Sequence, residues 1–406
     1  MRVLIISHMY PTEASPLSGI FVQKQAEALM AAGVELRLIH PTPWAPALLR
    51  WNARWRAYGA IPEQERHGEL TVYHPRVVEF PRGLFFAQAP GRYRRGMAPR
   101  VAEIVDTWRP NLIHAHVAHP DGAAAVAFGA RYRLPVVVTI HGQDFAQTLQ
   151  KNEACARSVK GTLARADRVI LVSDKLRTRY GLDQWATDLD KYRVIYNGVH
   201  LSDVVREVPP GVPAFNDDGS EGEAEPAEPV LLTVGFLRGA KGHAYVIQAL
   251  PALVRTYPNL TYRIVGQGAE RAALTQLAGD LGVQNHVVFC GELPHAAAMR
   301  EMAACDVMVL PSWDEGFGVV YLEALAHAKP IIGTVGEGIA PLIERERVGL
   351  TVPPRDSAAL ARAIGALLAD PAQARAMGVR GRTLVETQFT WDHNAEQTLS
   401  LYRELV

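Results

Sequence analysis

Cysteine is scarce in this chain of 406 residues, and long apolar runs are missing from it. The cysteines, Cys155, Cys290 and Cys305, are odd in number and widely spaced, which argues against a disulfide framework and a Cys-x-x-Cys metal site. No apolar run approaches the roughly 20 residues that span a bilayer. The run after Met1 is also too short for the core of a signal peptide. We therefore expect a protein of a reducing, bacterial-type cytoplasm.

Net charge is lacking as well, since 42 basic residues balance 42 acidic ones. Residues 1–205 carry 26 Lys and Arg against 18 Asp and Glu (+8), which leaves 16 against 24 (−8) for residues 206–406. This split suggests that the first half meets an anionic partner or that the halves attract each other. The composition is otherwise that of a globular protein, and the length favours two domains.

Apolar residues almost disappear between the two halves. Residues 208–229 consist mainly of Pro, Gly, Glu and Asp, and such a segment cannot bury apolar surface. We interpret residues 206–229 as an acidic flexible linker. It separates an N-terminal domain of residues 1–205 from a C-terminal domain of residues 230–388.

Short apolar runs alternate with helical patterns in both halves, which predicts an α/β fold with doubly wound parallel sheets. Strands are expected, among other places, at residues 3–6, 36–39, 135–140, 168–172, 230–234, 262–265 and 307–310. Helices are expected at residues 20–32, 243–256 and 319–328. Because ligands of such folds bind at the carboxyl ends of the strands, the turns there are the candidate site.

The most informative of these turns lies at residues 311–318, between an expected strand and an expected helix. Its backbone N–H groups would be unpaired at a helix start, where the dipole favours an anion. The residues concerned are Gly316, Phe317, Gly318 and Val319. Two glutamates, Glu315 and Glu323, flank the turn. Glu323 lies on the helix that follows, where its carboxylate can accept hydrogen bonds from a pair of sugar hydroxyls.

The pattern E-G-F-G-x4-E, from Glu315 to Glu323, resembles the signature of retaining nucleotide-sugar glycosyltransferases of family 4. That family has the GT-B fold, in which two Rossmann-like domains face a cleft. The resemblance implies that Glu315 contacts the donor sugar, that Glu323 holds the nucleotide ribose and that the glycine turn meets the donor through its backbone. A surface helix that happens to carry two glutamates is the alternative, but K-P-I-I-G at 329–333 and G-E-G-I at 336–339 add to the resemblance.

Residues 235–242 resemble the family's G-x-L-x-x-x-K-G segment, whose basic side chains clamp the donor diphosphate. Lys241 matches that segment position for position. Many relatives have an arginine directly after the first glycine, where this chain has Phe236, and we expect Arg238 to substitute for it. The alternative for both cations is solvent exposure beside a turn. Leu293 falls where the family's backbone commonly meets the nucleotide base.

In the first half, P-x-x-G-I-F-V-x-x-Q resembles the start of bacterial family 4 transferases that build polysaccharides. The resemblance implies that the loop with Gly19 lies beside the donor sugar and acceptor. It also implies that His141, in T-x-H-G-x-D, hydrogen-bonds a hydroxyl of the donor sugar. A plain loop glycine and a structural histidine are the alternatives. The resemblance also implies that a last helix in residues 389–406 crosses back to the first domain, as in GT-B proteins.

Two further patterns have the residue types of cofactor sites. His114-Ala115-His116, near His119 and Asp121, has the composition of a metal site. We expect the first two rings to lie on opposite faces of a strand, without a Cys or carboxylate cluster to complete a shell, so zinc is not expected. The Gly-x-Gly at 266–268 lacks the third glycine of a dinucleotide site, so NAD is not expected either.

Residues 44–100 interleave ten arginines with aromatic residues, against four glutamates. This composition suits an anionic membrane surface or a lipid-diphosphate acceptor. No helix-turn-helix or zinc-finger pattern supports nucleic acid as the partner. The alternative is a solvated, loop-rich insertion with its own aromatic core.

Together these patterns predict transfer of a hexose from a UDP- or GDP-sugar to an acceptor hydroxyl, with the anomeric configuration retained. Lys241, Arg238 and the turn amides would stabilise the leaving diphosphate. Glu315 and Glu323 are interpreted as binding groups and not as a hydrolase pair. No D-x-D motif lies in a plausible donor loop, so no metal or other cofactor is expected.

We expect a lipid-linked or polysaccharide acceptor in cell-envelope glycan synthesis, with the protein in the cytoplasm at the inner face of the membrane. A GT-B enzyme on a small soluble acceptor, or a nucleotide-sugar epimerase, would instead be active without lipid. A non-catalytic nucleotide-sugar-binding protein would bind without turnover.

Overall fold

The computed structural model describes residues 1–12, 15, 18–47, 51–80, 83–205, 228–313 and 316–406. The chain forms two compact units: unit 1 is Met1–Asn197 with Trp391–Val406, and unit 2 is Gly198–Thr390. Residues 198–205 belong to unit 2 because Val199 pairs with Thr390 and its N–H donates to Phe389 O at 3.0 Å. The expected linker lies, apart from residues 228 and 229, outside the described residues.

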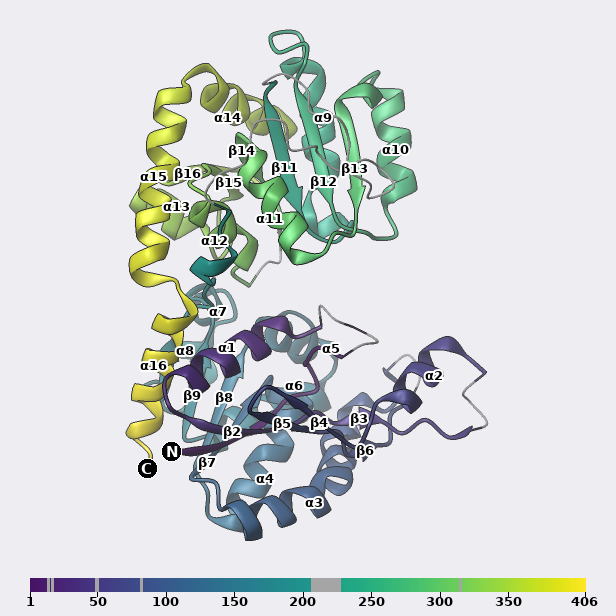
Figure 1. Ribbon diagram of the computed structural model, residues 1–406, viewed down its shortest axis with the longest axis vertical. Helices are drawn as coiled ribbons and strands as arrows, with labels where there is room; N and C mark the ends of the chain where they lie inside the picture. Colours follow the sequence, from purple (N-terminus) through teal and green to yellow (C-terminus); the bar gives the residue numbers. More distant parts are fainter. Residues whose placement is uncertain (13–14, 16–17, 48–50, 81–82, 206–227, 314–315) are drawn as a thin grey trace. The chain divides into compact units, whose positions relative to one another are not determined.

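Unit 1 is built on an eight-stranded sheet in the order β10-β9-β8-β7-β1-β2-β5-β4 (Figure 1). All neighbouring strands are parallel except β4, which runs antiparallel to β5. The strands are β1 Arg2–Ile6, β2 Glu35–Ile39, β4 Gln64–His67, β5 Leu70–Tyr73, β7 Leu112–His116, β8 Val136–Ile140, β9 Arg168–Leu171 and β10 Tyr192–Val194. A separate parallel pair joins β3 Thr42–Pro43 to β6 Arg76–Val77.

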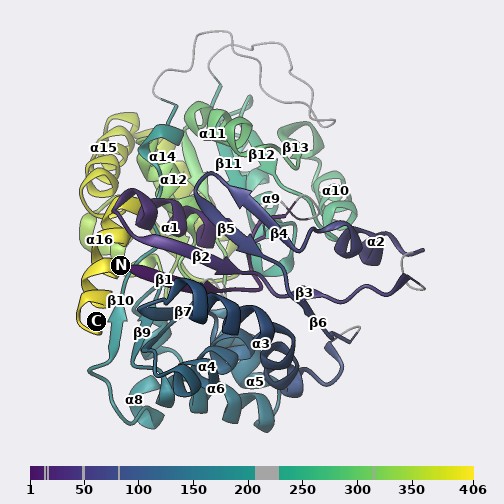
Figure 2. The same ribbon diagram turned by 60° about the horizontal axis from the view of Figure 1, so that its bottom comes forward.

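Helices cover both faces of this sheet, as Figure 2 shows for α1 on one side and α3, α4 and α6 on the other. Each face has its own apolar core, one shared with α3, α4 and α6 and the other with α1 and α16. The helices are α1 Ile20–Ala31, α2 Ala53–Ala60, α3 Ala89–Trp108, α4 Ala123–Tyr132, α5 Leu149–Lys151, α6 Glu153–Arg165, α7 Lys175–Thr178, α8 Leu182–Trp185 and α16 Trp391–Arg403.

Residues 44–100 contribute regular structure to unit 1, and so they are more than the loop-rich insertion that was the alternative for this segment. Strand β5 pairs with β2, and β4 adds a further strand beyond it. Tyr73 and Tyr93 are buried in the same core as the strands of the main sheet. The sequence L-T-V-Y of β5 consists of good strand formers, and the arginine-rich composition around it concealed this signal.

Unit 2 has a fully parallel six-stranded sheet in the order β13-β12-β11-β14-β15-β16. The strands are β11 Val230–Val234, β12 Thr261–Val265, β13 Val287–Gly291, β14 Val307–Val309, β15 Ile331–Thr334 and β16 Gly349–Val352. The helices are α9 His243–Leu253, α10 Arg271–Asp280, α11 His295–Ala304, α12 Val319–Ala326, α13 Ala340–Glu346, α14 Ser357–Ala369 and α15 Pro371–Gln388. Helices α9, α10 and α14 share one apolar core with the sheet.

In both sheets the strand order reverses beside the first strand. Strand β1 lies between β2 and β7, and β11 lies between β12 and β14. At such a reversal the connecting helices leave toward opposite faces, so a crevice opens beyond the carboxyl ends of the two strands. The turns after β1, β7, β11 and β14 are therefore positioned to hold ligands. Among the described residues, no helix is long and apolar enough to cross a membrane.

Candidate functional site

The turns that follow β11, β12, β13 and β14 lie against one another at the carboxyl edge of the unit 2 sheet. Gly235 N–H donates to Val265 O at 2.9 Å, and Gly266 N–H donates to Gly291 O at 2.7 Å. Trp313 N–H donates to Ala240 O at 2.8 Å, which ties the turn after β14 to the turn after β11. These backbone bonds form one continuous surface from turns that are distant in sequence.

Lys241 lies on this surface, in the turn between β11 and α9. Gly242, directly after it, has φ +78°, and a Cβ there would collide with Pro311 O. Only glycine therefore permits the close approach of the two turns. The Lys241 side chain passes over Gly235, where an added Cβ would lie 3.8 Å from Lys241 Cδ. The Lys241 side chain therefore lies at the point where the strand order reverses.

Phe236 and Arg238 form a pair in the same turn. The guanidinium carbon of Arg238 lies 5.1 Å from the centroid of the Phe236 ring, and Phe236 is 47% exposed. Stacking of this kind orients a guanidinium on an aromatic face. Phe236 therefore supports a cation from the position where many relatives carry one. That Arg238 clamps a diphosphate stays a prediction.

The glycine turn leads into α12 as the sequence predicts. Gly318 precedes the helix with φ +84° and, as a glycine, supplies no side-chain cap to the first turn of α12. Phe317 is buried and stacks on Phe389, with ring centroids 6.2 Å apart. A Cβ on Gly338 would collide with Gly316 O, so the next turn packs tightly over this one. Glu315 lies outside the described residues.

Glu323, on α12, has a partner that the sequence did not indicate. Its Oε1 lies 3.2 Å from Nε2 of His295, whose Nδ1 is 3.9 Å from the Asp203 carboxylate. The Glu323 side chain keeps 19% of its surface exposed, so its carboxylate remains reachable. His295 begins α11 directly after Leu293 and Pro294, and Leu293 itself is buried. One feature of the sequence could have indicated His295: it stands at the start of a helix, directly after the turn that is expected to bind the nucleotide base.

In unit 1, His141 and the Gly19 loop come together. The His141 and Phe21 rings have centroids 4.3 Å apart, and Phe21 follows Gly19 at the start of α1. Gly19 has φ +69°, and a Cβ there would collide with the Met9 backbone. Gly19 therefore has a packing reason to be glycine, besides any role toward a ligand. His141 is half-buried at the end of β8.

Asp144 shapes the turn that carries His141. Its Oδ1 accepts from Ala118 N–H at 2.5 Å and its Oδ2 from His141 N–H at 3.3 Å, so it joins the turns after β7 and β8. Burial raises the pKa of Asp144 to about 6, although the backbone donors oppose this shift. The side chain thus acts as a brace for the His141 turn.

The histidine pair of β7 corrects an expectation. The His114 and His116 rings stack with centroids 4.6 Å apart, so they lie on the same face, because side chains two residues apart in a strand point the same way. His116 stacks in turn on His141, with centroids 5.3 Å apart. Burial lowers the pKa of His114 and of His141 to about 3, and that of His116 lies well below its ordinary value. All of these rings are therefore neutral near pH 7.

Two family models match this chain. The model of Glycosyltransferase Family 4 covers residues 18–203, and that of Glycosyl transferases group 1 covers residues 217–384. A D-inositol 3-phosphate glycosyltransferase of Acidothermus cellulolyticus is 30% identical over 73% of this chain and 67% of its own length. The chain belongs to glycosyltransferase family 4.

Other similar proteins agree with family 4. The putative teichuronic acid biosynthesis glycosyltransferase TuaC of Bacillus subtilis is 29% identical, over 90% of this chain and 88% of its own. The crystal structure of the Anabaena protein HepE in complex with UDP superposes with a TM-score of 0.72 at 20% identity, and the match covers 100% of both chains. At this identity the likeness shows the fold alone, which is the GT-B fold.

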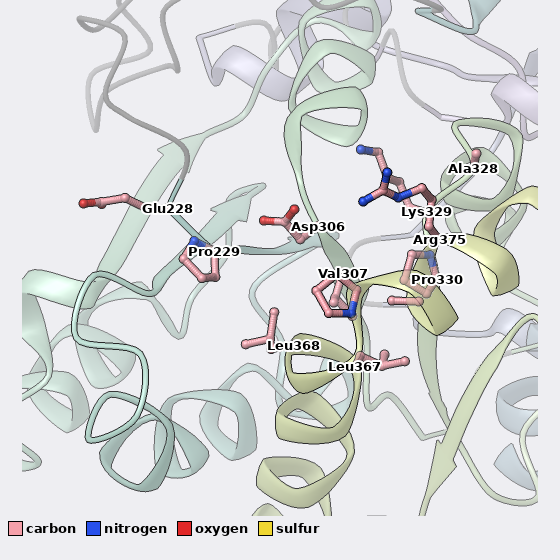
Figure 3. Close-up of a pocket in the computed structure, with 12 residues that line it drawn as sticks. Glu228, Pro229, Asp306, Val307, Ala328, Lys329, Pro330, Leu367, Leu368 and Arg375 are labelled. Atoms are coloured by element: carbon pink, nitrogen blue, oxygen red, sulfur yellow. The ribbon is translucent and has the colours of Figure 1, made fainter.

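The pocket in Figure 3 lies at the edge of the unit 2 sheet where the strands begin, opposite the turns that carry the family 4 motifs. Its lining includes residues that precede β11, β14 and β15, such as Pro229, Asp306 and Lys329. Asp306 is engaged in structure there, since its Oδ2 accepts from Val230 N–H at 2.8 Å. Ligands of doubly wound sheets bind at the carboxyl ends of the strands, so we do not assign this pocket to the donor.

His8 and His119 of unit 1 are held by hydrogen bonds within the unit. His119 lies 2.8 Å from Ser158 Oγ and 2.9 Å from Phe86 O, and Asp121 lies 2.6 Å from His8 Nδ1. Within the part of the chain that the structure describes, no group of three or more His, Cys, Asp or Glu residues is placed to hold a metal ion.

The arginine-rich segment of this family 4 glycosyltransferase exposes large apolar side chains. They are Trp44, Trp51, Val78, Phe80, Leu84 and Phe85. Arg92 donates to the carbonyls of Val78 at 2.8 Å and Phe85 at 3.1 Å, and its guanidinium carbon lies 5.0 Å from the Phe80 ring centroid. Arg92 therefore shapes the exposed loop, whereas Arg94 and Arg95 are exposed beside it.

Proposed function

We propose that the protein is a retaining transferase that moves a hexose from a nucleoside diphosphate sugar to a hydroxyl of a lipid-linked or polysaccharide acceptor. The observation that carries the proposal is the meeting of the Lys241 turn with the glycine turn before α12, at the reversal of strand order in unit 2. A cation and a helix start on two turns that meet in this way suit a diphosphate, because both favour negative charge. Glu323, on the same helix, has a partly exposed side chain whose carboxylate can accept hydrogen bonds from a ribose.

The similar proteins support the donor and acceptor classes of this proposal. HepE binds UDP in its crystal structure, and TuaC is named as a putative glycosyltransferase of teichuronic acid biosynthesis. The first half of the chain carries the excess of basic residues and exposes the aromatic loop, a combination that suits an anionic lipid surface.

In the proposed reaction, the bond from the anomeric carbon to the diphosphate oxygen breaks while a bond to the acceptor oxygen forms on the same face. The acceptor's hydroxyl proton passes to the departing phosphate oxygen. Lys241, Arg238 and the amides before α12 stabilise the negative charge that develops on the diphosphate. His141 hydrogen-bonds a hydroxyl of the donor sugar, and no metal ion takes part.

The donor class is tested by thermal unfolding with UDP, GDP, ADP and their sugars, in the presence of EDTA. A ligand at 100 times its Kd stabilises the folded state by about 2.7 kcal/mol. We expect one nucleotide family to raise the midpoint. Stabilisation by none of them would remove the basis of the transferase proposal, and stabilisation without sugar transfer would favour a binding protein.

Replacement of Glu323 by alanine is expected to weaken nucleotide binding by roughly 10- to 150-fold. The estimate corresponds to the loss of hydrogen bonds to a charged acceptor, about 1.5–3 kcal/mol. Isothermal titration with the stabilising nucleotide measures the change in Kd. Glu344→Ala, at an exposed glutamate of α13, is the matched control. Equal affinities of the Glu323 variant and the wild type would refute the ribose contact.

The acceptor surface is tested with anionic vesicles of phosphatidylglycerol. Each basic residue near such a surface contributes about 1 kcal/mol, so Arg94→Glu with Arg95→Glu should lower the partition coefficient by roughly 30-fold. Arg92 is left in place because it holds the carbonyls of the loop. Arg131→Glu with Arg133→Glu, two exposed residues around the end of α4, is the control. Equal sedimentation of both variants with vesicles would contradict the lipid surface.

A further inference from the structure

A hydrogen bond joins two histidines of unit 1, the buried His116 and the half-buried His141. His116 Nδ1 lies 3.0 Å from His141 Nε2. On the other side of the stack, His114 Nδ1 lies 2.6 Å from the Tyr402 hydroxyl, and His114 Nε2 lies 2.7 Å from Thr139 Oγ1. Both ring nitrogens of His114 therefore have hydrogen-bond partners. Among the described residues, the hydrogen bond from His116 is the one that connects these two rings to His141.

The position of the shared proton follows from the second nitrogen of His116. A neutral imidazole carries one N–H and one lone pair, so only one of the two rings donates in this bond. His116 Nε2 is buried and has no hydrogen-bond partner among the described residues. If His141 donated, His116 would carry its proton on Nε2, and a buried N–H would be left unpaired. If His116 donates from Nδ1, only a lone pair is left unpaired, and unpaired buried carbonyl-type acceptors are more common in proteins than orphaned N–H groups.

The same argument determines which nitrogen of the His141 ring carries the proton. With Nε2 accepting from His116, neutral His141 carries its proton on Nδ1. The structure shows no partner for His141 Nδ1 within the described part of the chain, and the ring is half-buried at the carboxyl end of β8. Nδ1 is therefore the nitrogen left for a ligand, and it offers a hydrogen rather than a lone pair.

We propose that His116 is a positioning residue, which donates from Nδ1 to His141 Nε2 and so holds His141 as a hydrogen-bond donor toward an oxygen of the sugar. In this state His141 has no free lone pair, so it orients a hydroxyl and does not serve as a general base. The low pKa of both rings, which burial causes, keeps this neutral arrangement over the physiological range. The catalytic consequence rests on the proposed function, but the tautomer of His141 does not.

The test is long-range ¹H–¹⁵N NMR of the full chain with ¹⁵N-labelled histidine, which distinguishes a protonated from a bare ring nitrogen. The His141 signals are assigned from their loss in His141→Asn. In the wild type we expect a protonated Nδ1 and a bare Nε2. A protonated Nε2 overturns the proposal by itself, without any assay of activity.

Two variants of His116 separate the effect of its hydrogen-bond donor from the effect of its aromatic ring. His116→Phe keeps an aromatic ring in the stack but removes the donor, so His141 should become a mixture of tautomers. His116→Asn retains an N–H near the position of Nδ1, so the Nδ1-protonated form should persist. His40→Asn replaces a buried histidine of unit 1 that does not contact His141, and it should leave the His141 signals unchanged. An unchanged tautomer in His116→Phe also overturns the proposal.

Kinetics then measure the consequence for transfer. Loss of a residue that orients a functional group lowers rates on the order of 10- to 100-fold. We expect His116→Phe to lower kcat in this range with little change in the KM of the acceptor, and His116→Asn to restore most of it. Equal kcat values for the two variants would refute the positioning role. If no variant or wild type transfers sugar, the proposed function fails, while the NMR result still decides the tautomer.

Discussion

Replacement of Lys241 by alanine is expected to lower kcat by roughly 10²- to 10³-fold. This is the typical loss when one preorganised donor to a developing negative charge is removed. Lys241 is preorganised because Gly242 packs directly on Pro311, and Ala240 O binds the N–H of Trp313. The turn that carries Lys241 is thereby held against the turn after β14, where the diphosphate is proposed to bind. Steady-state kinetics with the donor identified by thermal unfolding measure the change.

Two controls show whether charge at this point causes the loss. Lys241→Met keeps most of the side-chain volume without the charge, so it should lose as much as alanine. Lys329→Ala removes a lysine at the opposite edge of the same sheet, in the pocket of Figure 3, and should leave kcat unchanged. A Lys241→Ala enzyme with nearly wild-type kcat would show that the diphosphate is stabilised elsewhere.

Much of the fold could be predicted from local patterns. The expected strand at 230–234 coincides with β11, and the helix expected at 319–328 begins where α12 begins. That helix ends at Ala326, because Ala328 adopts φ +56° and Lys329 N–H turns back to Ala324 O. Boundaries of this kind depend on tertiary contacts, which a periodicity cannot reveal. Strand β5 was missed because its neighbours in sequence are rich in arginine.

The candidate site was predictable where a contiguous motif carries it. Lys241 and Glu323 each lie in such a motif, and the structure places both turns at the same sheet edge. His295 could not be predicted in the same way, since its contact with Glu323 depends on the packing of α11 beside α12. The bond between His116 and His141 likewise joins two strands, β7 and β8, that are separated by a helix in sequence.

A buried ion pair in unit 2 provides the largest expected effect on stability. Arg263, on β12, donates from its guanidinium to both carboxylate oxygens of Glu301, on α11, at 2.6 and 2.9 Å. The two side chains are only 10% and 3% exposed. The strand expected at 262–265 contains Arg263, but the sequence did not indicate Glu301 as its partner. The ion pair holds α11, the helix that also carries His295, against β12.

Replacement of Glu301 by alanine is expected to destabilise the protein by about 3–5 kcal/mol, because it leaves the guanidinium buried without its carboxylate. Urea unfolding measures the change in the free energy of unfolding of this unit. Glu386→Ala, which breaks the exposed pair with Arg382, should change it by less than about 1 kcal/mol.

The double variant Arg263→Met with Glu301→Leu decides the physical cause. Replacement of a buried ion pair by apolar residues of similar volume is often neutral or stabilising, since neither charge is then desolvated. We expect the double variant to recover most of the free energy of unfolding that Glu301→Ala loses. A double variant as unstable as Glu301→Ala would show that α11 needs the two hydrogen bonds between Arg263 and Glu301, and not merely the absence of an unpaired charge, to stay on the sheet.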